Sequence, residues 1–193
     1  VIVFRDIDES RALALKMAHT VQYDQLTDLP NRFLLMERLK VEMEQVRDSG
    51  KKLGLLLLDV DRFRLINEEF GFDYGDALLK KVAKRIRQQL RQGEMLSRHN
   101  ADEFMVLVPG IEQVGELGSL AVSIKEHVMQ ISQLRPELGD FSASIGVSVY
   151  PDDAADAQAL MLHADAAMNR AKGDASYEGI CFFSEQMDSN FTL

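Results

Sequence analysis

The chain has 193 residues and a formal net charge of −9 at pH 7, which suits one domain with its own hydrophobic core and a short extension. Such an acidic balance excludes a surface that attracts nucleic acid or an anionic membrane. No apolar run reaches the roughly 18 residues of a membrane span, and the single cysteine, Cys181, excludes an internal disulfide framework. We therefore expect a small ligand, held by local cations, backbone amides or a metal, and a cytoplasmic location.

The first part of the chain predicts a connector that leads into the domain. Residues 1–6 have the apolar character of the end of a β-strand, and Leu13, Met17 and Val21 then recur at helical spacing. Because the chain begins with Val1 rather than Met, we expect it to be a segment of a longer protein.

The middle of the chain predicts helices and strands in alternation. A helix is expected over residues 31–47, followed by "LGLLLLDVD" (53–61), a continuous apolar run ending in acids that is typical of a strand buried on both faces. A further helix, "DALLKKVAKRIRQQL" (76–90), carries its cations on a face turned to solvent. The stretch "LSRHNADEFMVLVP" (96–109) predicts two strands joined by a four-residue corner.

The last third of the chain completes the pattern. Apolar positions from Leu117 to Ile131 predict a helix, and the strict alternation in "FSASIGVSVY" (141–150) predicts a strand with one buried face. A last helix is expected over residues 155–172, and "GICFF" (179–183) is expected to close the sheet. This order of elements predicts an α/β (α+β) fold with a mixed central β-sheet flanked by helices.

Two pairs of acids stand where strands end. Asp59 and Asp61 follow the apolar strand, and Asp102 and Glu103 occupy the corner of the hairpin. Carboxylates from neighbouring strands suit Mg²⁺, which takes oxygen ligands and shares them with substrate phosphates, so phosphoryl transfer is the leading chemistry. The alternative is that the first pair caps a helix or turn and that the second is simply solvated at a hairpin tip.

The segment "VDRFRLINEEFGFDYGD" strengthens the nucleotide interpretation. A helix is expected to start just after the first acids, and Asn67 and Asp76 offer groups that hydrogen-bond a purine edge. On physical grounds alone, Asn67 as an ordinary helix residue and Asp76 as a cap remain equally good interpretations.

Five ordered motifs give the sequence its resemblance to a known family. They are "DQLTDLPNR" (24–32), "DVDRFRLINEEFGFDYGD" (59–76), "RHNADEF" (98–104), "SASIGVSVYP" (142–151) and "HADAAMNRAK" (163–172). In these motifs the chain resembles the GGDEF domains of bacterial cyclic-di-GMP signalling. The resemblance implies a fold similar to the nucleotidyl-cyclase catalytic core. It also implies a homodimer for catalysis, in which two facing domains each hold one GTP and join them into cyclic di-GMP with loss of two pyrophosphates.

The resemblance also divides the chain and assigns it neighbours. Residues 1–22 are expected to be the exit strand of a sensor domain and a connector helix, residues 23–184 the GGDEF domain, and residues 185–193 the start of a linker. "VIVFRDIDES" resembles the exit of a PAS sensor domain, and "FFSEQMDSN" resembles the bridge into an EAL phosphodiesterase domain.

The resemblance implies a role for each residue of the site. Mg²⁺ (or Mn²⁺) would be held by Asp59 and Asp102, with the Val60 carbonyl assisting and Glu103 close to the metal. One of the two corner acids would help to deprotonate the attacking 3′-hydroxyl. The other implied roles are guanine recognition by Asn67 and Asp76, phosphate binding by backbone amides near Phe63 and Arg64, and phosphate neutralisation by Lys172.

The chain departs from the family pattern at three places. Asn100 and Ala101 stand where the family has two glycines, which permit positive φ and a close approach of the nucleotide. Asn tolerates the left-handed region, whereas Ala loses on the order of 1 kcal/mol there and adds a methyl group. Ser176 stands where the family has an arginine on the phosphates.

The third departure lies in the inhibitory product site of the family, an Arg-x-x-Asp motif. It appears here as Arg91 and Glu94, in "RQGE". The longer glutamate disfavours binding of cyclic di-GMP, and an ordinary pair at a helix end is the favoured interpretation.

These observations leave three hypotheses. The favoured one is a degenerate GGDEF domain that binds GTP and Mg²⁺ and regulates a linked domain, and the alternative is a diguanylate cyclase of low activity. The third is a scaffold that binds no nucleotide and transmits dimerisation from a sensor. The retained acids disfavour the scaffold, and the lost glycines and arginine disfavour the active cyclase.

Overall fold

The computed structural model describes residues 10–13, 16–17, 19–139 and 141–184. Its centre is a five-stranded mixed sheet in the order β2-β3-β1-β4-β5, in which only the β4–β5 pair is parallel. The strands are β1 (Lys52–Val60), β2 (Met95–Arg98), β3 (Glu103–Ile111), β4 (Ala143–Tyr150) and β5 (Ile180–Phe182). The mixed sheet predicted from the sequence is confirmed.

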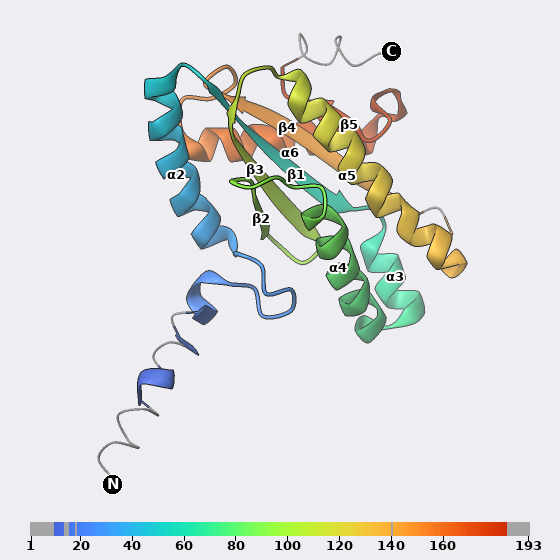
Figure 1. Ribbon diagram of the computed structural model, residues 1–193. Helices are drawn as coiled ribbons and strands as arrows, with labels where there is room; N and C mark the ends of the chain where they lie inside the picture. Colours follow the sequence, from blue (N-terminus) through green and yellow to red (C-terminus); the bar gives the residue numbers. More distant parts are fainter. Residues whose placement is uncertain (1–9, 14–15, 18, 140, 185–193) are drawn as a thin grey trace, which may run out of the picture.

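Helices cover both faces of this sheet (Figure 1). One face packs on α3, α4 and α5 and the other on α2 and α6, and each face has its own cluster of buried apolar side chains. The helices are α2 (Arg32–Ser49), α3 (Phe63–Phe70), α4 (Phe72–Arg87), α5 (Gly115–Leu134) and α6 (Ala157–Gly173), with short 3₁₀ turns η1 (Pro136–Leu138) and η2 (Ala175–Tyr177). The central strand β1 is buried on both faces along almost its whole length, as its continuous apolar run predicts.

Strand β4 corrects one expectation. Every residue from Ala143 to Tyr150 is buried, so this strand does not have the single buried face that its alternation predicts. Its polar face is made of small residues, and the Ser148 hydroxyl donates to the Leu160 carbonyl of α6 at 2.7 Å. Small hydroxyl groups can be buried in this way once they are hydrogen-bonded.

The segment before α2 is tied to the domain by a compact loop. The described residues between 10 and 22 are helical, and Tyr23 then bridges to Pro30. Leu29 inserts into the core, and Asn31 caps α2 by accepting a hydrogen bond from the Leu34 amide.

Two segments that the sequence analysis discussed lie outside the described residues. They are the expected sensor exit strand at residues 1–6 and the expected linker at 185–193. In the part of the chain that is described, no helix combines the length and the apolar character needed to cross a membrane.

Candidate functional site

The end of β1 and the hairpin corner meet at one end of the sheet. In the antiparallel pairing of β1 with β3, Asp59 lies opposite Glu103, and the Val60 amide donates to the Asp102 carbonyl at 3.2 Å. The structure therefore brings together all four residues that the sequence analysis proposed around a metal. From α6, Lys172 places its Nζ 2.7 Å from Asp59 Oδ2, and the Asp59 side chain is only 9% exposed.

The electrostatics of these acids are typical of a site that lacks enough positive charge. Burial raises the pKa of Asp59 to about 6, although the Lys172 ammonium opposes this and the neighbouring Asp102 and Glu103 add to it. Burial likewise raises the pKa of Asp102, and Glu103 contributes to the increase. A bound cation stabilises the ionised form of crowded carboxylates that are buried or partly buried.

The donor atoms fit Mg²⁺, although they do not form a complete cage. Among the described residues, no three His, Cys, Asp or Glu side chains gather into a ready-made metal site. Two carboxylates and the Val60 carbonyl are hard oxygen donors, and Mg²⁺ is commonly bound by one or two carboxylates together with substrate phosphates. Lys172 is the counter-ion of the Asp59 carboxylate.

The corner itself corrects a second expectation. The described non-glycine residues with positive φ are Asp28, Arg62 and Glu178, so neither Asn100 nor Ala101 adopts the left-handed conformation. The turn therefore carries no left-handed strain at the alanine. Instead, the Asn100 side-chain amide donates to a carboxylate oxygen of Glu103, a contact that a glycine at this position does not make.

Asp61, which the sequence pairs with Asp59 as a candidate metal acid or turn cap, makes its contacts with the start of β4. Its backbone amide donates to the Ser142 carbonyl at 3.0 Å. Its carboxylate accepts hydrogen bonds from the Ser142 and Ser144 hydroxyls. These contacts fix the turn between β1 and α3 to the start of β4.

The start of α3 presents unpaired amides beside the acids. Arg62 precedes the helix with φ 59° and gives it no side-chain cap. The first amides of any helix lack intrahelical partners and attract anions. The amides near Phe63 and Arg64, which the resemblance assigns to phosphate binding, belong to this first turn.

Asn67 and the start of α4 lie against each other. A Cβ on Gly75 would lie 1.9 Å from Asn67 Oδ1, so only glycine leaves room for this side chain. Asn67 Oδ1 is buried and has no hydrogen-bond partner among the described residues. Asp76, which follows Gly75 in the chain, is exposed. A buried acceptor without a donor beside an exposed carboxylate is an arrangement suited to a ligand that brings donors.

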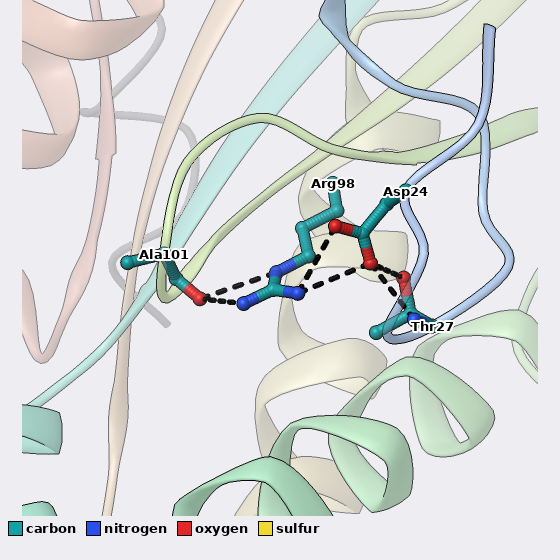
Figure 2. A network of polar contacts seen from close by, with 4 residues as sticks. All are labelled: Asp24, Thr27, Arg98 and Ala101. Atoms are coloured by element: carbon teal, nitrogen blue, oxygen red, sulfur yellow. Dashed lines mark hydrogen bonds and ion pairs between the residues drawn. The ribbon is translucent and has the colours of Figure 1, made fainter. Parts of the chain in front are cut away.

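Arg98 links the corner to the loop before α2, and Figure 2 shows its guanidinium lying between the two. Its Nη1 donates to both carboxylate oxygens of Asp24 at 3.1 Å, and its Nε and Nη2 donate to the Ala101 carbonyl. Asp24 also accepts from the Thr27 amide and hydroxyl. Burial alone would raise the pKa of Asp24, but the bonds from Thr27 and Arg98 outweigh it and hold the pKa below its usual range.

Asp24 and Arg98 begin two of the five sequence motifs, and nothing in the sequence pairs these motifs. The contact between residues 24 and 98 joins positions 74 apart in the chain, and no periodic pattern reveals such a contact. The one available signal was that each motif carries an unassigned residue of opposite charge.

Two further sequence departures have a clear location. Arg91 and Glu94 adjoin each other, since Glu94 Oε2 accepts from the Arg91 amide at 2.7 Å. They line a cavity of about 470 Å³ together with the far end of β3, so they lie away from the corner acids. Ser176 lies exposed in η2, where its amide donates to Asp174.

The fold and this end of the sheet define the class of protein. The mixed sheet flanked by helices is shared with a solved GGDEF domain. Residues 21–176 match the family described as Diguanylate cyclase, GGDEF domain. The chain belongs to this family, whose members serve cyclic-di-GMP signalling in bacteria.

Curated relatives from Pseudomonas aeruginosa give the same result. The chain is 37% identical over 168 residues to the bifunctional diguanylate cyclase/cyclic di-GMP phosphodiesterase MucR, covering 87% of this chain and 24% of MucR. It is 35% identical over 164 residues to the diguanylate cyclase TpbB, covering 82% of this chain and 37% of TpbB. The chain thus spans about a quarter to a third of these relatives.

Solved structures agree in fold. The GGDEF domain of YfiN (TpbB) from P. aeruginosa matches with a TM-score of 0.71 and 32% identity, covering 81% of this chain and 97% of that one. A sensory box/GGDEF family protein from Caulobacter crescentus matches with a TM-score of 0.70 and 33% identity. The match covers 79% of this chain and 98% of that one.

Proposed function

We propose that this chain binds GTP with Mg²⁺ and acts mainly as a degenerate regulatory module of a cyclic-di-GMP signalling protein. The observation that carries the proposal is the convergence of Asp59, Asp102 and Lys172 at the end of the sheet, beside uncapped amides of α3. The hydrogen bond from Asn100 to Glu103 supports a regulatory role, because it engages an acid that turnover would need.

In this proposal each group has a defined task. Asp59, Asp102 and the Val60 carbonyl hold the metal, which neutralises phosphate charge when bound. Lys172 exchanges its contact with Asp59 for the phosphates, and the α3 amides hold the phosphates from the other side. The buried Oδ1 of Asn67 and the exposed carboxylate of Asp76 accept hydrogen bonds from guanine.

A second function is favoured by the same retained acids. If Glu103 exchanges its bond to Asn100 for the 3′-hydroxyl of a facing GTP, the chain is a weak diguanylate cyclase. The hydroxyl oxygen then forms a bond to the α-phosphorus, pyrophosphate leaves, and the second half-reaction repeats the step to close cyclic di-GMP.

The name of one relative supports a proposal about the neighbours of the module. MucR is named as both cyclase and phosphodiesterase, and we propose that this chain likewise adjoins a phosphodiesterase domain of the EAL type and a PAS sensor. GTP binding would then change the activity of the linked phosphodiesterase.

Nucleotide selectivity and product analysis test the proposal. We expect calorimetry in Mg²⁺ to show GTP binding and to show ATP binding at least about tenfold more weakly, because an unmatched base leaves buried polar groups unpaired at roughly 1–3 kcal/mol each. Chromatography after incubation with GTP should show little cyclic di-GMP. Sustained conversion would favour the weak cyclase, and equal binding of ATP and GTP would contradict the assignment of Asn67 and Asp76.

A further inference from the structure

A cavity of about 780 Å³ opens beside the acids, on the side away from the hairpin corner. Asp59 and Lys172 line it together with Asp61 and Arg62 from the turn before α3, whereas Asp102 does not. From α5, a helix with no part in the site described above, Lys125 lines the same cavity. The cavity therefore joins the proposed metal end of the site to a cation from a distant part of the sequence.

Lys125 is a cation of this cavity that has no acidic partner among the described residues. Lys172 is paired with Asp59, and Asp61 accepts from two serine hydroxyls. Lys125 donates its ammonium to the main-chain carbonyl of Glu178, and no carboxylate among the described residues lies within ion-pair distance of it. An ammonium in a cavity wall whose described partner is a neutral carbonyl is available to form a charge-assisted hydrogen bond with an anion.

Glycine at position 179 leaves room for this ammonium. Gly179 has φ 78°, and a Cβ there would lie 2.7 Å from Lys125 Nζ and 3.2 Å from the Ala143 carbonyl. A larger residue at position 179 would therefore displace the lysine from the cavity wall. Arg62 also lines the cavity, but it is exposed, and solvent and salt screen its charge more strongly.

We infer that Lys125 is a phosphate-binding residue that contacts the terminal phosphates of a bound nucleoside triphosphate. The inference rests on the proposed function, since it assumes that GTP occupies this end of the sheet. The terminal phosphates are the ones indicated, because the cavity contains Lys172 and the turn before α3 but not the corner acid Asp102.

Charge-removing and charge-keeping variants test this inference. GTP and GMP are titrated by calorimetry in Mg²⁺ into the wild type, Lys125→Met, Lys125→Arg and Lys84→Met. Lys84 is an exposed lysine of α4, so its variant matches the change in net charge without touching the cavity. Thermal unfolding of each variant reports whether the fold is kept.

We expect Lys125→Met to weaken GTP binding about tenfold and GMP binding less than twofold, while Lys125→Arg and Lys84→Met stay within about twofold of the wild type for both. An unchanged GTP affinity in a folded Lys125→Met variant overturns the inference and leaves the proposed function standing. An equal loss for GTP and GMP overturns the assignment to the terminal phosphates. A wild type that binds no GTP overturns the proposed function and this inference with it.

Discussion

Among single residues, Asn100 and Ala101 of the hairpin corner determine the surroundings of the acid Glu103. Neither Asn100 nor Ala101 is in the left-handed conformation, so the corner carries no left-handed strain. What distinguishes it is the Asn100 side chain bound to Glu103, together with the methyl group of Ala101 beside it. In the place of two glycines, these residues thus engage an acid of the corner and add a methyl group, in a turn that needs no left-handed residue.

The double variant Asn100→Gly, Ala101→Gly should therefore raise cyclic-di-GMP formation. It releases Glu103 and clears the corner, and a misplacement of about 1 Å at a reacting centre can cost 10²-fold in rate. The Ser176→Arg variant restores one cation and should gain no more than roughly tenfold. Both are assayed with the wild type at saturating GTP. A larger gain from Ser176→Arg, or no gain from the glycine pair while GTP still binds, would contradict this account of the corner.

At the scale of elements, the packing of α6 on β4 sets the position of Lys172. A Cβ on Gly146 would lie 2.1 Å from the Ala164 carbonyl and 2.2 Å from the Met168 amide, both in the backbone of α6. Backbone atoms cannot rotate away as a side chain can, so any residue but glycine must push the helix off the sheet. Because α6 carries Lys172, the stability of the fold and the geometry of the site are linked here.

We expect Gly146→Ala to lower the free energy of unfolding by about 2–3 kcal/mol, the upper part of the range for overpacking. Urea denaturation measures the change. The control is Gly173→Ala at the end of α6, where a new Cβ meets nothing within 4 Å. A Gly146→Ala variant as stable as this control would show that the helix can shift freely.

The link between Arg98 and Asp24 connects the loop before α2 with the corner. The Arg98 side chain is 13% exposed and that of Asp24 is 23% exposed, so this ion pair is better shielded than most surface pairs. We expect Asp24→Asn to lower the free energy of unfolding by about 1–2 kcal/mol near neutral pH, because it removes a charge-assisted contact and leaves Arg98 without a counter-ion.

The pH dependence of this effect has a defined sign. The pKa of Asp24 is lowered in the folded chain from its ordinary value of 3.8, so its stabilisation is present above that value and is lost as the pH falls through the folded pKa. The difference in stability between wild type and Asp24→Asn should shrink as the pH drops below about 4. Asp48→Asn, an exposed change on α2, serves as the control. A difference that stays constant to about pH 3 would contradict the role of the ionised carboxylate.

At the scale of the whole molecule, the proposed chemistry requires two chains. Each domain would hold one GTP, and each 3′-hydroxyl must meet the α-phosphate of the other. We therefore expect cyclic-di-GMP formation per molecule of the Asn100→Gly, Ala101→Gly variant to rise with protein concentration until dimers saturate. A rate per molecule that is independent of concentration down to the lowest dilution, with only monomers in light scattering, would contradict this.

Much of the architecture could be predicted from sequence because strong apolar patterns produced it. The run ending at Asp59 predicts a central strand, and its register with β3 places Asp59 opposite Glu103. Strand β4 was predicted correctly as a strand, but its exposed face was predicted wrongly because Ser144 and Ser148 suggest contact with solvent. These serines are hydrogen-bonded to Asp61 and to α6. Small residues on a strand favour the close approach of a helix as readily as they favour exposure.

The parts of the site that could not be predicted depend on contacts between distant segments. The bond from Arg98 to Asp24, the cavity position of Lys125 and the conformation at Ala101 follow from tertiary packing and leave no periodic signal. Family resemblance supplied the proposed roles of Asp59 and Asp102 but not the bond from Asn100 to Glu103, which depends on the conformation of the corner.

Metal-dependent GTP binding is the central claim, and one calorimetric experiment tests it most directly. GTP is titrated into the wild type in Mg²⁺ and again in EDTA, with Asp59→Asn as the variant that removes a proposed metal ligand. We predict clear binding in Mg²⁺, at least about tenfold weaker binding in EDTA, and little difference between the two conditions for Asp59→Asn. Equal GTP affinity of the wild type with and without Mg²⁺ would contradict the claim that these acids form a metal site.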